Sequence, residues 1–237
     1  MDASVGMAHG PPEMGWAELL RIIHVTAGFA ALALLWFPLL SSKGARLHRR
    51  TGVAYVVAMA VVAATALPLG AARALDAELA PRSRLFGVFL IFIALFTANA
   101  LTFGLRALRL QTRTGPHRHP LDLGSPALLL ALAVGTIGLG ARAGFPLLMI
   151  FPWIALFLSI SQLRYWLTTP GPRLHGQREH MGAMFAASIA TLTAFTTFGA
   201  PRLLGLSGTH LALWLAPTTV MVPWLVRWQR RLARREA

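Results

Sequence analysis

Seven long apolar stretches account for most of this chain of 237 residues. They cover residues 16–41, 52–73, 85–108, 126–142, 145–167, 180–200 and 209–228. A bilayer core needs about 20 mostly apolar residues for each helical crossing. Because lipid offers no hydrogen bonds to the backbone, and period-2 alternation is absent, such stretches are stable only as helices. The sequence therefore predicts an all-α polytopic membrane helix bundle with about seven transmembrane helices.

The composition agrees with a lipid environment. Hydrophobic residues make up 56% of the chain and charged residues only 13%, and the mean hydropathy is +0.60. A soluble domain carries about 25% charged residues. The chain contains no cysteine, which excludes disulfides and thiolate metal sites.

The cations are divided unequally between the two ends of the predicted helices. Sixteen of the 22 Lys and Arg residues fall on the side that holds the connections after the first, third and fifth stretches and the C-terminal tail. By the positive-inside rule, the N-terminus lies outside and the C-terminus is cytoplasmic, as in a multi-pass protein of a bacterial inner membrane. We expect an extracytoplasmic tail over 1–15, a seven-helix membrane domain over 16–228 and a basic cytoplasmic tail over 229–237.

The net charge of +14 would suggest nucleic acid in a soluble protein. Here the cations cluster at the ends of apolar stretches, where anionic lipid headgroups are the expected partner. The sequence therefore predicts contact with the bilayer surface and no binding of nucleic acid.

His24 lies about eight residues inside the first stretch. An ionisable group at that depth is costly and should face the bundle interior or a cavity. Gly28 follows one helical turn later on the same face and leaves room for a flat ligand such as a haem macrocycle. The same space would also let a neighbouring helix pack closely, with His24 in a structural hydrogen bond.

Three further histidines border predicted helices. His48 precedes Gly52 by one turn and shares a helix face with Tyr55 and Met59 if the helix begins early. His180 shares a face with Met184, Ala187 and Thr191, a combination that could serve haem or copper. His210 begins the last stretch. Each of the three is also common in a purely interfacial role.

The predicted topology pairs these histidines by depth. His24 and His210 lie toward the outside, and His48 and His180 lie toward the cytoplasm. Two such pairs would suit two b-type haems, with these four histidines as iron ligands and Gly28, Gly52 and Met184 in the surrounding site. Electrons could then cross the bilayer in two steps, to or from a redox partner or quinone. The sequence assigns no catalytic residue.

Two alternatives use the same residues differently. In a non-enzymatic transporter or membrane assembly factor, the histidines would be structural or proton-handling. A zinc hydrolase needs a carboxylate beside the metal. We expect no Asp or Glu inside a span, because the one acidic residue within the seven stretches, Glu18, lies two residues after the start of the first. This argues against hydrolysis.

The connection Arg109 to Ser125 is expected to be a loop that solvates His117 and His119, with Pro126 in the first turn of the following helix. That helix carries Gly135, Gly138, Gly140 and Gly144, which are expected to form a packing ridge.

The histidine motifs resemble those of an uncharacterised bacterial family of multi-pass predicted membrane proteins with a domain of unknown function. The resemblance covers about two-thirds of the chain. It consists of His24 in the first stretch, a His-Arg-x-x-Gly-x-x-Tyr sequence from His48 to Tyr55, and a later helix led by His180. It implies a helical membrane fold and draws attention to these histidines, but it implies no established activity.

Overall fold

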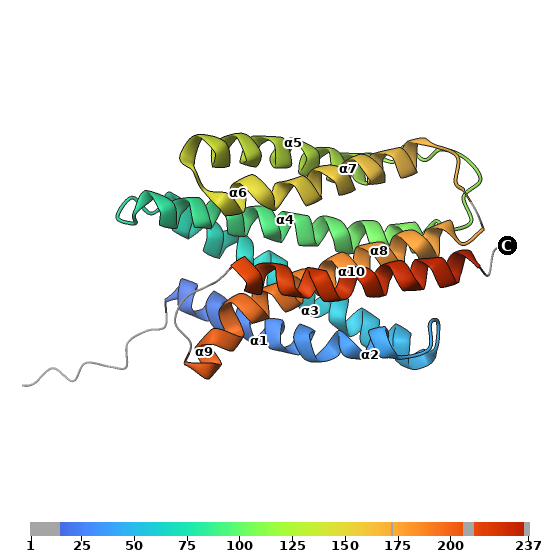
Figure 1. Cartoon of the computed structure of the whole chain (residues 1–237), viewed down its shortest axis with the longest axis horizontal. Coiled ribbons are helices and arrows are strands. Elements are labelled where there is room, and N and C mark those ends of the chain that lie inside the picture. The colour runs from blue at the N-terminus through green and yellow to red at the C-terminus, as the bar shows by residue number, and fades with distance from the viewer. Residues whose placement is uncertain (1–14, 172, 206–210, 235–237) are drawn as a thin grey trace, which may run out of the picture.

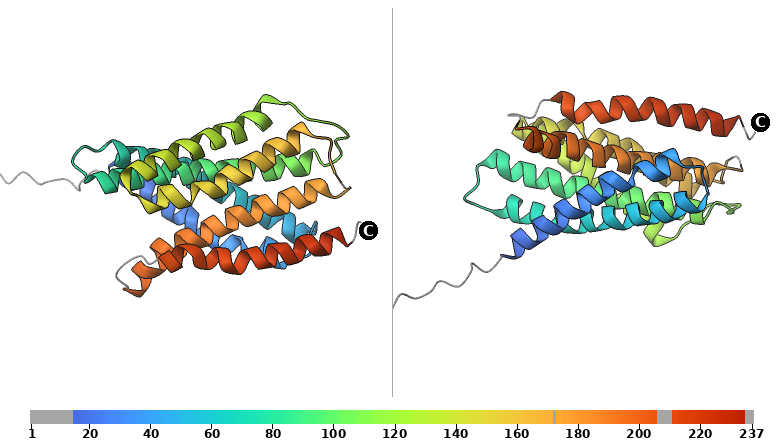
Figure 2. Two further views of the ribbon diagram at one scale, coloured as in Figure 1. Left: turned by 45° about the horizontal axis from the view of Figure 1, so that its top comes forward. Right: turned by 90° about the horizontal axis from the view of Figure 1, so that it is seen from below.

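The computed structural model describes residues 15–171, 173–205 and 211–234, and within them the secondary structure is helical, without strands. The helices pack side by side as one elongated bundle (Figures 1 and 2). Their bounds are α1 Trp16–Leu34, α2 Trp36–Leu40, α3 Arg46–Leu75, α4 Pro81–Arg109, α5 Pro120–Ala143, α6 Pro146–Ile150, α7 Pro152–Leu167, α8 His175–Ala194, the π-helix η1 Phe195–Gly199, α9 Ala200–Leu204 and α10 Leu211–Ala233.

Six candidate membrane spans are present in the described residues. They are Trp16–Leu40, Arg46–Leu75, Pro81–Arg109, Pro120–Ala143, Pro146–Leu167 and His175–Leu204. Each corresponds to one of the first six apolar stretches. The seventh stretch corresponds to α10, which is not among these six spans. His210 and the tail 1–14 lie outside the described residues. The structure therefore supports a multi-pass membrane protein with at least six apolar helices.

Prolines explain two interruptions within the spans. Pro38 has no backbone N–H to donate to the carbonyl of Leu34, the residue at which α1 ends. Pro152 likewise cannot donate to Leu148, and α7 begins at this proline after the short α6. Each span therefore consists of two helical segments in one apolar stretch.

The start of α5 differs from the prediction. The expected loop up to Ser125 is wrong at its C-terminal end, because α5 begins at Pro120 and Pro126 lies inside it. The ring of His119 accepts a hydrogen bond from the backbone N–H of Leu121 over 3.2 Å. This cap, with Pro120 in the first turn, starts the helix two turns earlier than its apolar stretch does.

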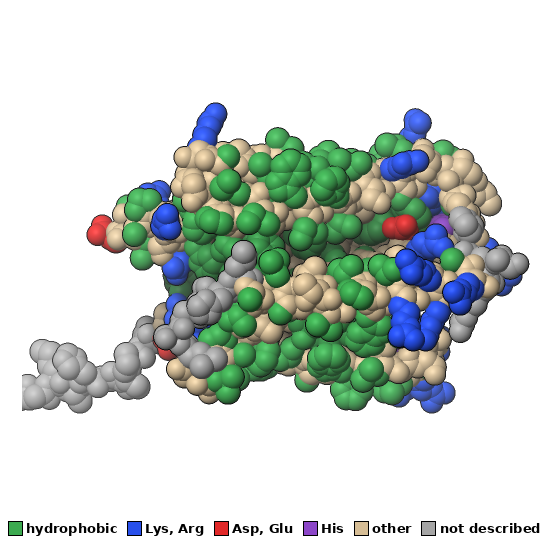
Figure 3. Space-filling view, viewed as in Figure 1, with side chains coloured by type: hydrophobic (Ala, Val, Ile, Leu, Met, Phe, Trp, Pro, Cys, Tyr) green, Lys and Arg blue, Asp and Glu red, His purple; other side chains and the backbone are tan. Residues whose placement is uncertain are grey.

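α4 lies at the centre of the bundle and packs against α3, α8 and α5, while α1 packs on α3 and α10 packs on α8 (Figure 1). The outer surface of one face is apolar along the middle. Lys and Arg gather at its ends, most densely at the end where the C-terminus lies (Figure 3). This distribution is the one expected of helices that cross a bilayer and end in headgroups.

Glycines set the closest helix contacts, but not where the sequence suggested. A Cβ added at Gly135 or Gly138 would meet no atom within 4 Å, so these two are not part of a packed ridge. Gly140 does pack closely, on α6, and Gly144 ends α5 in a left-handed conformation with φ of 59°. The tight α3–α4 contact instead uses Gly87, where a Cβ would lie 2.6 Å from the backbone nitrogen of Ala74.

We expect Gly87→Ala to destabilise the bundle, because backbone atoms of α3 cannot move aside as a flexible side chain could. Overpacking of this kind costs about 1–3 kcal/mol. Gly135→Ala is the matched control and should be neutral or slightly stabilising. The measurement is the free energy of unfolding in mixed detergent micelles, and equal values for the two variants would contradict the packing described above.

Candidate histidine site

His24 binds α3 through its Nδ1 atom. Nδ1 lies 3.1 Å from the carbonyl oxygen of Val62 and 3.0 Å from the hydroxyl of Thr65. The Thr65 hydroxyl itself donates to the carbonyl of Val61 over 2.7 Å. Because both partners of Nδ1 act as acceptors, Nδ1 carries the proton and the lone pair is on Nε2.

His48 has the same arrangement at the other end of α3. It lies inside the helix, in the first turn, so the early start on which its role depended is present. Its Nδ1 donates to the carbonyl of Pro38 in α2 over 3.1 Å. A carbonyl only accepts, and the lone pair of His48 is therefore also on Nε2.

Lys43 helps to fix that carbonyl. Its Nζ donates to Pro38 over 2.6 Å and to Leu39 over 3.1 Å, and it lies 3.8 Å from the centre of the Trp228 ring. Partial burial against these groups lowers the pKa of Lys43 to about 8. Lys43 thus joins the end of α2 to α10 beside His48.

His180 repeats the pattern between α8 and α4. Its Nδ1 donates to the carbonyl of Gly104 over 3.0 Å. Gly104 permits this contact because it has no side chain: a Cβ there would lie 2.7 Å from Cε of Met184 and 2.8 Å from Cβ of Ala183. Met184 is thereby placed against α4, in the packing between the two helices.

The histidines lie at two levels of the bundle. His48 lies in the first turn of α3 and His180 in the second turn of α8, and both helices begin at the end of the bundle where the C-terminus lies (Figure 1). His24 bonds to Thr65, which follows His48 by 17 residues in α3. That separation corresponds to about 25 Å along a helix. The structure therefore places His48 and His180 at the same end of the bundle and His24 well away from them.

The two predicted histidine faces pack against each other between these levels. The hydroxyl of Tyr55 in α3 lies 3.1 Å from that of Thr191 in α8, and the Thr191 hydroxyl lies 3.2 Å from Sδ of Met59. All three side chains are buried. The face that begins at His48 therefore meets the face that begins at His180.

The two glycines singled out with the histidines have open surroundings. A Cβ at Gly28 would meet no atom within 4 Å, and one at Gly52 would only reach Cβ of Pro38 at 4.0 Å. Neither glycine is needed for helix packing. Space for a ligand next to these positions is therefore compatible with the fold.

The loop histidines have the opposite proton placement. Nδ1 of His119 accepts from a backbone N–H, so its proton is on Nε2. Nε2 of His117 bonds to the carboxylate of Asp122 over 2.7 Å and is therefore the protonated atom. The two groups of histidines therefore differ in the nitrogen that carries the proton. It is Nδ1 in His24, His48 and His180, and Nε2 in His117 and His119.

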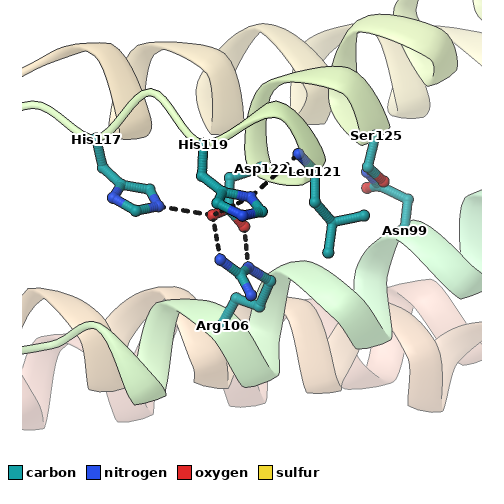
Figure 4. A network of polar contacts seen from close by, with 7 residues as sticks. All are labelled: Asn99, Arg106, His117, His119, Leu121, Asp122 and Ser125. Atoms are coloured by element: carbon teal, nitrogen blue, oxygen red, sulfur yellow. Dashed lines mark hydrogen bonds and ion pairs between the residues drawn. The ribbon is translucent and has the colours of Figure 1, made fainter.

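A second polar cluster, which the sequence did not predict, joins α4 to the start of α5 (Figure 4). The side chain of Asp122 is 2% exposed and accepts two hydrogen bonds from the guanidinium of Arg106 in α4, one of them from Nη2 over 2.6 Å. The expectation that no carboxylate lies inside a span is wrong, because the observed spans include Glu18 and Glu179 as well as Asp122. Its sequence signal is the helix start itself, a proline at the first position and an acid in the first turn.

Comparison with known protein families, with curated proteins and with solved structures found no match to this chain.

Proposed function

We propose that this chain is a membrane protein that binds b-type haem through histidine Nε2 atoms and passes electrons across the bilayer. One observation supports this most strongly. All three candidate histidines within the described residues donate Nδ1–H to a main-chain carbonyl, and their Nε2 atoms have no hydrogen-bond partner there.

That arrangement fits the requirements of an iron ligand. A metal-binding imidazole commonly donates its other N–H to a carbonyl or carboxylate, which fixes the ring and increases the basicity of the ligating nitrogen. His48 and His180 would hold an inner haem, and His24 with His210 an outer one. The bound iron would supply one-electron redox chemistry, and the chain supplies the anchored rings, with Gly28 and Gly52 leaving space beside them.

The proposed topology has seven spans, with α10 as the last, the N-terminus outside and the C-terminus in the cytoplasm. This follows from the bias of the cations and from the apolar length of α10. The basic end would contact anionic lipid headgroups, and a quinone or a redox protein would exchange electrons with the haem. Membership of the resembled bacterial membrane family is part of the same proposal.

A transporter or assembly factor is the second candidate, favoured by the buried Asp122 and its contact with His117. A buried carboxylate in a span, joined to an imidazole at the end of that span, is typical of proton-handling sites. Proton-dependent uptake of a solute by vesicles would support this alternative.

Electron transfer can be tested in sealed lipid vesicles that enclose ferricyanide. An impermeant reductant is added outside, and the loss of ferricyanide absorbance is followed. Vesicles with the haem-loaded chain should reduce the enclosed ferricyanide many times faster than vesicles with His180→Ala. Equal rates, at equal protein content, would contradict electron transfer across the bilayer.

A further inference from the structure

Polar side chains line the interface of α4, α5 and α7, apart from the histidine site. Each helix contributes two of them; Arg106 has a side-chain exposure of 25%, Ser125 is half-buried, and the other four are buried. The pairs are Asn99 and Arg106, Asp122 and Ser125, and Ser159 and Gln162. Polar groups at such positions in a membrane helix are costly unless they are hydrogen-bonded.

The register of the helices aligns these residues in depth. α4 and α7 run in the same direction, with α5 antiparallel between them in the chain (Figure 1). The rings of Phe103 and Trp166 are in contact, with centroids 5.7 Å apart. Asn99 precedes Phe103 by four residues, and Gln162 precedes Trp166 by four. Asn99 and Gln162 therefore lie at the same level, one helical turn further from the basic end of the bundle.

Two atoms in this region have no hydrogen-bond partner. They are Oγ of Ser159, whose residue is fully buried, and Oε1 of Gln162, whose residue is 5% exposed. Both lie on the buried stripe of α7 that ends at Trp166. A buried acceptor without a partner costs about 1–3 kcal/mol, so these atoms call for a ligand that donates hydrogen bonds.

A small cavity lies at the same interface. Its volume is about 10 Å³, and its lining includes Asn99, Asp122, Ser125 and Trp166. A volume of this size is the lower limit for one water molecule, which also needs two to four polar partners. The amide of Asn99, the hydroxyl of Ser125 and the carboxylate of Asp122 provide them. Asn99 already donates to Ser125 over 2.9 Å, which leaves its second N–H free to bind water.

We propose that this interface holds a short chain of internal waters that leads from the basic end to the unpartnered atoms of Gln162 and Ser159. The chain begins at His117, whose side chain is 27% exposed and bonds to Asp122. It continues past Ser125 and Asn99 to Gln162 and Ser159.

The chain ends at a dry aromatic cluster. Phe89 contacts Phe151 and Trp214 edge-to-face, with ring centroids 5.7 and 5.5 Å apart. Phe92 and Leu129 are buried in the same cluster. Its side chains are aromatic or aliphatic, so they offer water few hydrogen-bond partners beyond the level of Ser159.

Hydroxyl-radical labelling by short X-ray pulses tests the proposal, because radicals formed from internal water oxidise the side chains beside it. Phe103 and Phe92 are matched probes, since both are buried phenylalanines of α4 with exposures of 6% and 3%. Phe103 should be oxidised several-fold faster than Phe92. After rapid mixing with H₂¹⁸O, its product should contain ¹⁸O, because the chain exchanges with the solution.

Variants then locate the water. Asn99→Leu and, separately, Gln162→Leu should lower the labelling of Phe103 toward that of Phe92. Thr136→Ala is the control in α5, because that hydroxyl already donates to the carbonyl of Leu132 in its own helix over 2.7 Å, and it should leave the labelling unchanged. Three results would each overturn the proposal: equal labelling of Phe103 and Phe92, labelling of Phe103 that neither leucine variant changes, or a Phe103 product without ¹⁸O. None of these results depends on haem.

Discussion

Replacing Asp122 with leucine should lower the free energy of unfolding by about 3 kcal/mol, the largest stability effect expected of a single polar residue in this chain. The carboxylate accepts both hydrogen bonds from Arg106 and one from His117. Its loss leaves the guanidinium near the membrane interior without a counter-charge. The measurement is reversible unfolding in mixed detergent micelles.

The double variant Arg106→Met with Asp122→Leu distinguishes a lost ion pair from general damage. Removing both charges also removes the cost of leaving one unpaired, so most of the stability should return. Asp76→Asn is the control, since Asp76 is exposed and accepts only a local hydrogen bond from the backbone of Glu78. A double variant as unstable as Asp122→Leu would show that the pair does not hold α4 to α5.

Replacing His48 or His180 with alanine should lower the haem content of the purified chain at least about tenfold, since even the supporting partners of a metal ligand change affinity by about 10–100-fold. His24→Ala should remove haem from the outer level only. The measurement is the ratio of extracted haem to protein after expression with ample haem.

His119→Ala is the matched control for these variants. Its Nδ1 accepts a backbone N–H and its Nε2 is protonated, so His119 offers no lone pair for iron. Its replacement should leave the haem content unchanged. Added imidazole should restore haem to His180→Ala if the lost group is a ligand, whereas a structural role would not be rescued. Haem loss in His119→Ala equal to that in His180→Ala would contradict the assignment.

The sequence was sufficient for the helices because apolar length and charge at the ends are properties of the chain alone. It also predicted correctly that Tyr55 shares a face with His48, and Thr191 a face with His180. It could not predict that these faces meet, since two helix faces pair only through tertiary packing. The sequence also could not predict the tautomers of the histidines. Each tautomer depends on a carbonyl that accepts from the imidazole and lies 10 to 76 residues away along the sequence.

The errors have physical causes as well. Asp122 was assigned to a loop because hydropathy alone marks only the apolar part of a helix, whereas the polar first turn of α5 is stabilised by the His119 cap and by Arg106. Gly135 and Gly138 were expected to pack because small residues permit close approach. Small size does not require a neighbour, and the tight contact between α3 and α4 uses Gly87 instead.

The visible spectrum of the purified wild-type chain tests haem binding most directly. The protein should be expressed with ample haem, purified in mild detergent, and measured oxidised and after reduction with dithionite. We expect a Soret band that shifts on reduction, together with the sharp bands of a low-spin b-type haem. A spectrum with no Soret band in either state would contradict it.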